Sequence, residues 1–380
     1  MASNWMLAPR ATSHKTPATI KTHPPKTLIV GAGLAGSLLA WRLQQMGQAF
    51  HLIGSSQLPN AWSVAAGVIN PVTGRWMTKS WAFDALRQQA HLCYQALEKQ
   101  FQKSFFHAIP LTRYCQQPDD VKRLGRRRRN PRYQSVIGHQ HSAGSGHPGL
   151  RDSFGHFDIL QAAYVNIPAL IDCLHRDFAH QGCWQDALFN YSALQYQSGQ
   201  STWQYQGQHY QRVIFCEGCG LKHNLWFRNL PVQAAKGETL LLRAPQLALP
   251  TALFHHRKWL LAYPNGTCRL GSSYDEADSS PLPTAQAYRS LLDAFEHMTV
   301  QNTTYRVEEQ RAGHRPTTPD SRPILGQHPT YSGLFVLNGL GSKGASLAPS
   351  LAEQLIQLIW QQKPLLPEVD LQRWPQTWTQ

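Results

Sequence analysis

The stretch KTLIVGAGLAGSLLAWRLQQMGQAFHLIG, residues 26–54, decides the fold class. Its apolar run at 28–30 is typical of a strand buried on both faces, as in a parallel sheet. A glycine-rich turn follows, and from Leu38 onward apolar residues recur at helical spacing until Gly47. A second strand follows this helix. The order strand, turn, helix, strand predicts a βαβ unit and therefore an α/β fold.

Three glycines of the turn, Gly31, Gly33 and Gly36, have the spacing G-x-G-x-x-G. The first allows a tight turn, the second lets the backbone approach a pyrophosphate, and the third lets the helix pack closely on the sheet. The N–H groups at the start of the helix then face the phosphates. Between a strand and a helix this motif predicts a dinucleotide site; the alternative is a glycine-rich turn without a ligand.

The second strand lacks the Asp or Glu that normally binds the adenosine ribose, because it ends in Gly54, Ser55 and Ser56. The Arg that accepts the 2′-phosphate of NADP is also missing, since neither Lys nor Arg occurs between Arg42 and Arg75. These absences disfavour NAD and NADP and leave FAD. We expect Ser55 or Ser56, with backbone groups at Gly54, to contact the ribose in place of a carboxylate.

The net charge of +14 is unevenly distributed along the chain. Residues 1–83 hold seven Lys and Arg without an acid, and residues 121–132, VKRLGRRRRNPR, hold seven more without an acid. The second segment predicts a basic loop that contacts RNA phosphates or is simply a solvated surface. Residues 1–25 mix Ser, Thr, Pro, Lys and His with little apolar pattern, which predicts a disordered basic tail.

The seven cysteines are an odd number in a long chain, which fits a reducing compartment and predicts a cytoplasmic protein. Cys216 and Cys219 form the sequence CEGC, but a zinc site would need a second pair at similar spacing. We therefore predict no metal site and expect both cysteines to be small core residues. The longest apolar stretch, TLIVGAGLAGSLLAW, is too short and too rich in glycine to predict a transmembrane segment.

Further elements follow from the spacing of apolar residues. Segments 80–101, 166–182 and 344–362 have helical spacing. Alternating segments such as LQYQSG and GETLLLRAP, and the turn signal PNGT, predict antiparallel strands. The chain is thus expected to combine a βαβ-type domain with antiparallel sheet.

Two more blocks carry a family resemblance: SVAAGVINPVTGRW at 63–76, and RAGHRPTTPDSRPILGQHPTYSGLFVLNGLGSKGASLAP at 311–349. With the glycine motif, they make the chain from Lys26 to about Lys363 resemble the FAD-dependent oxidoreductases of the D-amino-acid oxidase and glycine oxidase superfamily. The resemblance implies α/β plus α+β architecture, in which a Rossmann-like FAD-binding domain is interleaved with an antiparallel-sheet substrate domain. The FAD-binding domain would take 26–85, 153–230 and 311–365, and the substrate domain 86–152 and 231–310.

The resemblance also implies site residues. Arg315 falls where glycine-oxidase-like enzymes bind the substrate carboxylate, a task that suits a planar guanidinium; the alternative is a salt bridge with Asp320. Lys343 lies in a turn expected near the reactive end of the flavin, where it would contact substrate and cofactor unless it faces solvent. The residues expected to bind the cofactor are Gly31, Ala32, Gly33, Gly36, Ser55, Ser56, Ala65, Ala66, Gly67, Gly218, Gly341, Ser342, Lys343 and Gly344.

No side chain is assigned as a catalytic base, because hydride transfer from a neutral amine needs none. The segment TTPD has no cysteine within or just before it, so FAD is expected to bind non-covalently.

The implied reaction oxidises the C–N bond of an amino acid or N-substituted glycine-like amine by hydride transfer to flavin. Oxygen or another acceptor then takes the electrons. One alternative is a tRNA-modifying flavoenzyme that removes a carboxymethyl group from a wobble-uridine amine, with residues 121–132 contacting the RNA. The remaining alternative is a flavin-binding or RNA-binding protein without enzymatic activity.

Overall fold

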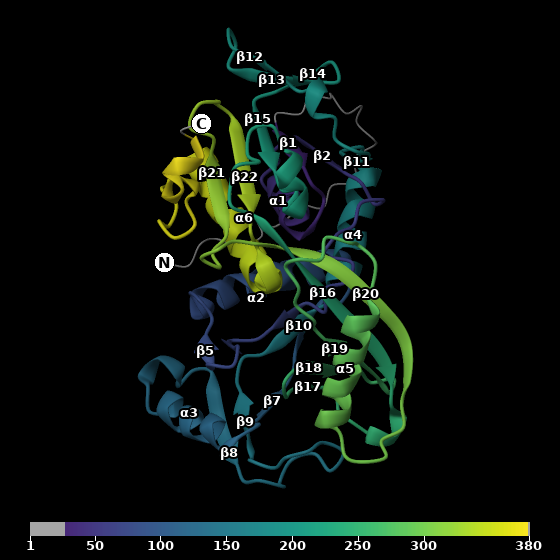
Figure 1. Cartoon of the computed structure of the whole chain (residues 1–380). Helices are drawn as coiled ribbons and strands as arrows, with labels where there is room; N and C mark the ends of the chain where they lie inside the picture. Colours follow the sequence, from purple (N-terminus) through teal and green to yellow (C-terminus); the bar gives the residue numbers. More distant parts are fainter. Residues whose placement is uncertain (1–26, 379–380) are drawn as a thin grey trace.

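The computed structural model describes residues 27–378 and contains two large sheets, one above the other in Figure 1. The upper sheet is mostly parallel and the lower one mostly antiparallel. This arrangement confirms the predicted fold class, in which an α/β part is combined with an antiparallel-sheet part. The predicted disordered tail at 1–25 lies outside the described residues.

Six α-helices occur between residues 27 and 378: α1 (Leu34–Gln45), α2 (Phe83–Phe101), α3 (Pro118–Arg128), α4 (Ile167–His180), α5 (Ala285–Met298) and α6 (Gly344–Gln361). Helices α1, α2, α4 and α6 confirm the helices expected from apolar spacing. The side chain of Asn166 caps α4 by accepting a hydrogen bond from the N–H of Ala169, which explains where that helix begins.

The prediction that residues 121–132 form a loop is wrong, because most of this segment belongs to α3. The helix begins at Pro118, has Asp119 and Asp120 in its first turn and ends in three arginines, a charge order that suits the helix dipole. Only Leu124 of this helix is buried, so the apolar spacing that predicted α1, α2, α4 and α6 is missing here.

The parallel sheet is built around β1 (Thr27–Val30), which is buried along its whole length. It pairs in parallel with β2 (Phe50–Gly54) on one side and β15 (Arg212–Phe215) on the other. The strand order is β11 (Trp184–Asp186), β2, β1, β15, β22 (Leu334–Asn338) and β21 (Ile324–Gln327). Strand β21 runs antiparallel to β22.

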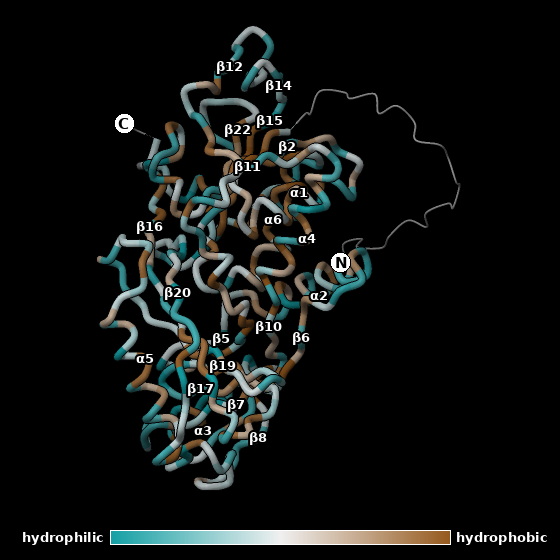
Figure 2. Tube along the Cα trace, turned by 90° about the vertical axis from the view of Figure 1, so that its right-hand side faces the viewer, coloured by the Kyte–Doolittle hydropathy of each residue, from teal (hydrophilic) through white to brown (hydrophobic). Residues whose placement is uncertain are grey.

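Both faces of this sheet are covered, as the continuous apolar run of β1 requires. Ile29 and Leu52 belong to the core cluster that includes residues of α1, α4 and α6. Leu28 and Val30, on the other face, belong to a second cluster with Trp203 and other residues of a small antiparallel sheet. Figure 2 shows hydrophobic segments gathered around β15, β22 and α1. The sheet that contains β1 and β2 is therefore the middle layer of three.

The antiparallel sheet has eight strands. Their order is β20 (Arg306–Thr317), β16 (Gln233–Arg243), β19 (Thr267–Gly271), β18 (Trp259–Ala262), β17 (Leu253–His255), β7 (Leu111–Tyr114), β9 (His156–Ile159) and β8 (Ile137–His141). Helix α5 packs on one face through a core that includes Leu240, Leu270, Leu291 and Phe295. The long ladder between β16 and β20 extends up to the parallel sheet (Figure 1).

The remaining elements are short. The strands are β3 (Val68–Ile69), β4 (Val72–Thr73), β5 (Thr78–Lys79), β6 (Phe106–Ala108), β10 (Ala163–Val165), β12 (Gln195–Gln197), β13 (Thr202–Tyr205) and β14 (Gln208–Tyr210). The 3₁₀ turns are η1 (Pro131–Tyr133), η2 (Tyr191–Ala193), η3 (Gly218–His223), η4 (Pro245–Leu247), η5 (Gly341–Lys343), η6 (Leu371–Arg373) and η7 (Pro375–Trp378).

The chain passes repeatedly between the two sheets. Strand β20 crosses the domain boundary predicted at 311, and β9 pairs in the antiparallel sheet although it lies within the predicted FAD-binding segment 153–230. The domain ranges stay a prediction. If strand pairing defined the domains, the FAD-binding segment that was expected to begin at 153 would begin after Ile159. No helix within residues 27–378 has both the length and the apolar character needed to cross a bilayer.

A buried ion pair joins α1 to α6. Arg42 Nε and Nη2 donate to Glu353 Oε2 at 3.0 and 2.9 Å, and the two side chains are 14% and 10% exposed. Replacing Arg42 by Met leaves the Glu353 carboxylate buried without its cationic partner. This should lower the free energy of unfolding by roughly 3–5 kcal/mol. Denaturant unfolding measures this loss. The matched double variant Arg42→Met, Glu353→Met should recover most of it, and an equally unstable double variant would contradict the ion-pair explanation.

Candidate active site

A cavity of about 810 Å³ lies where the two sheets meet. The carboxyl ends of β1, β2, β15 and β22 form one wall, and residues of β16, β18 and β20 form another. All the residues predicted to bind the cofactor line it except Gly36 and Lys343. Parallel α/β sheets bind ligands outside the carboxyl ends of their strands, so the position is the expected one for a cofactor.

The glycine turn forms the floor of this cavity. Gly31 has φ +105°, and a Cβ there would lie 2.3 Å from the carbonyl oxygen of Cys216. A Cβ at Gly36 would lie 1.9 Å from the carbonyl oxygen of Gly31. Gly33 is the N-cap of α1 and makes no side-chain capping bond, so the first N–H groups of the helix remain open to an anion.

The segment 64–68 lines the cavity beside this turn. Gly67 has φ +64°, and a Cβ there would lie 1.9 Å from the carbonyl oxygen of Val165, so only glycine fits. Arg311, on β20, donates from Nη1 to the carbonyl oxygen of Ser63 at 3.1 Å. Two blocks that lie far apart in the sequence are thereby held side by side at the cavity.

Arg315 reaches the same cavity from β20. Its Nη2 donates to Ser272 Oγ at 2.7 Å, whereas its buried Nη1 has no hydrogen-bond partner among the described residues. Burial lowers the pKa of Arg315 from its ordinary value, but an arginine stays charged at neutral pH. The alternative pairing with Asp320 is wrong, because Asp320 binds Arg373 at 2.9 Å. An unpaired buried guanidinium N–H favours an anionic ligand.

Small neighbours make room for this guanidinium. A Cβ at Gly237 on β16 would lie 1.9 Å from Arg315 Nη2, so the guanidinium lies flat across the strand only because residue 237 is glycine. Lys258 Nζ donates to the carbonyl oxygen of Ser272 at 2.8 Å and supports that serine from another side. Arg315 is therefore positioned by its surroundings before any ligand binds.

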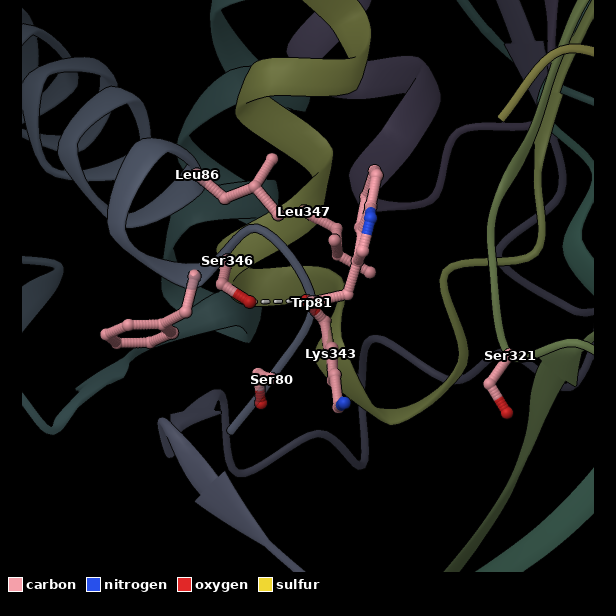
Figure 3. Close-up of a pocket in the computed structure, with 8 residues that line it drawn as sticks. Ser80, Trp81, Leu86, Ser321, Lys343, Ser346 and Leu347 are labelled. Atoms are coloured by element: carbon pink, nitrogen blue, oxygen red, sulfur yellow. Dashed lines mark hydrogen bonds between the residues drawn. The ribbon is translucent and has the colours of Figure 1, made fainter. Parts of the chain in front are cut away.

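Lys343 lies elsewhere. Its neighbours Ser342 and Gly344 line the large cavity, but the lysine side chain lines a separate pocket with Ser80, Trp81 and Ser321, as Figure 3 shows. That pocket has a volume of about 10 Å³ and holds no more than a water molecule. The structure thus does not bring Lys343 together with Arg315, and its predicted contacts with substrate and cofactor receive no support from this placement.

Several cavity residues were missed by sequence reasoning. His175 Nε2 lies 3.1 Å from the carbonyl oxygen of Ala32, and its ring stacks on Trp184 at a centroid distance of 4.4 Å. Glu217 binds the hydroxyl of Tyr191 and, at 2.8 Å, Asn224 Nδ2. The sequence had no motif for these contacts, because most of them join segments that lie far apart in the chain and meet only in the folded protein.

The two cysteines of CEGC are both close to the cavity. Cys216 is buried, as expected of a core residue, whereas Cys219 is half-buried and lines the wall. Burial raises the pKa of the Cys219 thiol to about 11, and the nearby Lys222 only partly opposes this. Both thiols are therefore protonated at neutral pH and are poor nucleophiles.

A family model described as "FAD dependent oxidoreductase" matches residues 26–358. The chain belongs to this family. The match confirms the predicted superfamily, and FAD is the cofactor of this flavoenzyme.

Curated relatives match over shorter stretches. The tRNA 5-methylaminomethyl-2-thiouridine biosynthesis bifunctional protein of Marinobacter nauticus is 30% identical over 149 residues, which are 37% of this chain and 24% of that protein. The glycine oxidase of Pseudomonas putida is 26% identical over 137 residues, 36% of this chain and 38% of that one. The aligned parts thus span well under half of these relatives.

Solved structures match over nearly the whole chain. Iminodiacetate oxidase from Chelativorans sp. BNC1 has a TM-score of 0.76 at 21% identity and covers 90% of this chain and 97% of its own. Glycine oxidase from Geobacillus kaustophilus has a TM-score of 0.77 at 20% identity, with 90% and 96% covered. At such identities the likeness establishes the fold of this flavoenzyme.

The residues of the cavity fit FAD. The positive φ of Gly31 and the uncapped start of α1 suit a pyrophosphate, and the turn Gly341–Gly344 brings the start of α6 to the same cavity. The cavity volume is in the range of sites that hold large organic ligands.

Glu217 should make the stability of the protein depend on pH. Burial raises the pKa of its carboxyl from 4.5 to about 7, although hydrogen bonds from Tyr191 and Asn224 favour the charged form. Between these pH values the unfolded chain has lost a proton that the folded chain retains, so stability falls as the pH rises through this window. Glu217→Gln removes this titration. The thermal midpoint of the variant minus that of the wild type should therefore increase as the pH rises from about 5 to about 7.5. A constant difference between the two proteins would contradict the raised pKa.

Proposed function

We propose that this flavoenzyme oxidises the C–N bond of an amine whose neighbouring carbon carries a carboxylate, such as an amino acid or an N-substituted glycine. The observation that carries the proposal is Arg315, a half-buried guanidinium in the cavity wall with one N–H unpaired. A substrate carboxylate bound at this guanidinium would form the charge-assisted pair that the free protein leaves incomplete. The names of the glycine oxidase and iminodiacetate oxidase relatives support the same class of substrate.

The chain's own residues bind and orient the amine. Ser272 accepts a hydrogen bond from one edge of the Arg315 guanidinium. Gly237 has no side chain and so leaves space for the guanidinium. Trp259 and Thr239 line the wall next to these residues and supply an apolar surface for the rest of the substrate. Holding the carboxylate at one point and packing the substrate carbon against a wall reduces the orientations that the amine can take.

The reaction removes two electrons from the amine. The substrate carbon gives up a hydride and the nitrogen a proton, which leaves a C=N bond that water hydrolyses to an amine and a carbonyl compound. FAD, when bound, supplies the electron acceptor, and oxygen or another acceptor takes the electrons afterwards. A neutral amine needs no side chain as base, so no residue is given that role. The protonated thiols of Cys216 and Cys219 support non-covalent binding of FAD.

The test of this function is anaerobic reduction of the flavin. We expect glycine or sarcosine to bleach the flavin absorption band of the wild-type protein. Arg315→Leu should raise the amine concentration needed for half-bleaching roughly a hundredfold, because it removes one partner of a desolvated charge pair. The flavin content of the purified protein should not change.

Gly237→Ala is the matched variant. The three atoms nearest to its added Cβ all belong to the flexible end of Arg315, so the variant should displace the guanidinium without unfolding the protein. The amine concentration needed for half-bleaching should rise about tenfold. Loss of FAD from either variant with an unchanged amine dependence would contradict the assignment of Arg315.

A second candidate function is oxidation of an N-carboxymethyl amine on a tRNA base. Helix α3 favours it, because Arg126, Arg128, Arg129 and Arg132 are exposed along this helix and the turn after it. Beside them Trp76 is 55% exposed and stacks with Arg123, a combination suited to phosphates and unpaired bases. The relative from Marinobacter nauticus carries tRNA in its name.

The RNA contact predicts a specific loss. Changing Arg126, Arg128 and Arg129 to Gln should weaken binding of undermodified tRNA and lower the slope of log affinity against log salt concentration by about 2–3. Gel-shift titrations over a range of salt concentrations measure both quantities.

The control variant changes three exposed cations outside α3, namely Lys99, Arg289 and Lys363, to Gln. If both triple variants bind tRNA alike, or if the wild type does not retain tRNA at physiological salt, α3 is a solvated surface and the second function is wrong.

A further inference from the structure

The acid missing from the end of β2 has a counterpart one strand away. Strand β11 pairs in parallel with β2, and in this ladder Asp186 stands opposite Gly54. Asp186 is the last residue of β11, as Gly54 is the last residue of β2, so both lie at the carboxyl edge of the sheet. Asp186 also lines the large cavity together with Gly54, Ser55 and Ser56.

The strand end of β2 has no room for a side chain. A Cβ at Gly54 would lie 2.7 Å from the Cβ of Ala32 and 2.8 Å from its backbone nitrogen. Ala32 belongs to the glycine turn, which must stay close to the sheet for the pyrophosphate site to form. A carboxylate at residue 54 would push this turn away. A carboxylate from the neighbouring strand does not meet this obstacle.

The loop after β2 holds the Asp186 carboxylate in place. The backbone N–H of Ser56 donates to Asp186 Oδ1 at 2.8 Å, and the Ser56 hydroxyl donates to Oδ2 at 2.6 Å. These bonds lower the pKa of Asp186 below its ordinary value, so it is charged at neutral pH. A carboxylate has about four lone-pair sites, and two are still open to hydroxyl donors.

Exposed apolar side chains line the same cavity as this carboxylate. Leu58 is 52% exposed and Leu188 is 61% exposed, and both line the cavity. Leu188 follows Asp186 by two residues, and Leu58 follows Ser56 by two residues. Two exposed leucines and one fixed carboxylate in the same cavity suit an apolar ring joined to a sugar that carries a pair of hydroxyl groups.

We propose that Asp186 binds the 2′- and 3′-hydroxyls of the adenosine ribose of FAD, and that Leu58 and Leu188 cover the adenine. Ser56 then orients the carboxylate instead of replacing it. The inference rests on FAD as the cofactor and does not depend on which amine is oxidised.

The test measures affinity for flavins and not turnover. Holoenzyme is diluted serially, and released flavin is read from its fluorescence to give Kd for FAD. Asp186→Asn retains the shape of the side chain and can still bind Ser56, but it removes the charge. We expect the Kd for FAD to rise about tenfold, the loss typical of a charge-assisted hydrogen bond.

FMN is the matched ligand, because it has the same flavin without the adenosine. The Kd for FMN, measured by displacement, should stay within about twofold in Asp186→Asn, whereas competition by ADP should weaken as much as FAD binding does. Ser56→Ala is the matched variant: it removes a bond to Asp186 but keeps the charge, so FAD binding should change less than in Asp186→Asn.

An unchanged Kd for FAD in Asp186→Asn would overturn the proposal. Equal losses of FAD and FMN would also overturn it, since Asp186 would then only support the fold. An equal loss in Ser56→Ala would reduce Asp186 to a support for the loop and overturn ribose binding. Failure of every amine to bleach the flavin would reject the proposed reaction and leave these binding results unaffected.

Discussion

The close approach of the β1–α1 turn to its neighbours governs the rest of the structure. Gly31 lies against the end of β15, and Gly36 lies against Gly31 itself, at distances that exclude a Cβ. This contact brings the start of α1 to the carboxyl edge of the sheet and points its first N–H groups into the cavity. The same contact brings Ala32 so close to Gly54 that β2 cannot carry a side chain at its end. One packing constraint thus opens the start of α1 to the cavity and leaves no room for a side chain at the end of β2.

The second determinant of the site is β20, which belongs to the antiparallel sheet but runs beside the cofactor wall. Arg311 on this strand holds the backbone of Ser63, and Arg315, four residues later, enters the cavity. Residues four apart on a strand lie on the same face. One strand therefore sets the position of a loop next to the cavity and of the guanidinium that we propose to bind the substrate carboxylate.

The predicted elements succeeded where a pattern was strong and local. The apolar run at 28–30, the glycine spacing and the helical period of α2, α4 and α6 each express one short-range physical rule. Helix α3 was missed because it buries only Leu124 and exposes a run of arginines, so its period carries no apolar signal. The helix dipole, the ion pair between Arg123 and Asp120 and the packing of Leu124 stabilise it instead. Composition alone therefore suggests a basic loop.

Local sequence was sufficient for the βαβ unit and the type of cofactor, because glycine spacing and residue chemistry act within one segment. The carboxylate-binding role of Arg315, which lines the cavity, stays a prediction. Local sequence was insufficient for the direction of Lys343, which points away from the cavity although its neighbours line it. It was also insufficient for Asp186, which is 130 residues from its partner Ser56. Strand pairing alone places that carboxylate opposite Gly54, since register is a property of the folded sheet and leaves no mark in either segment.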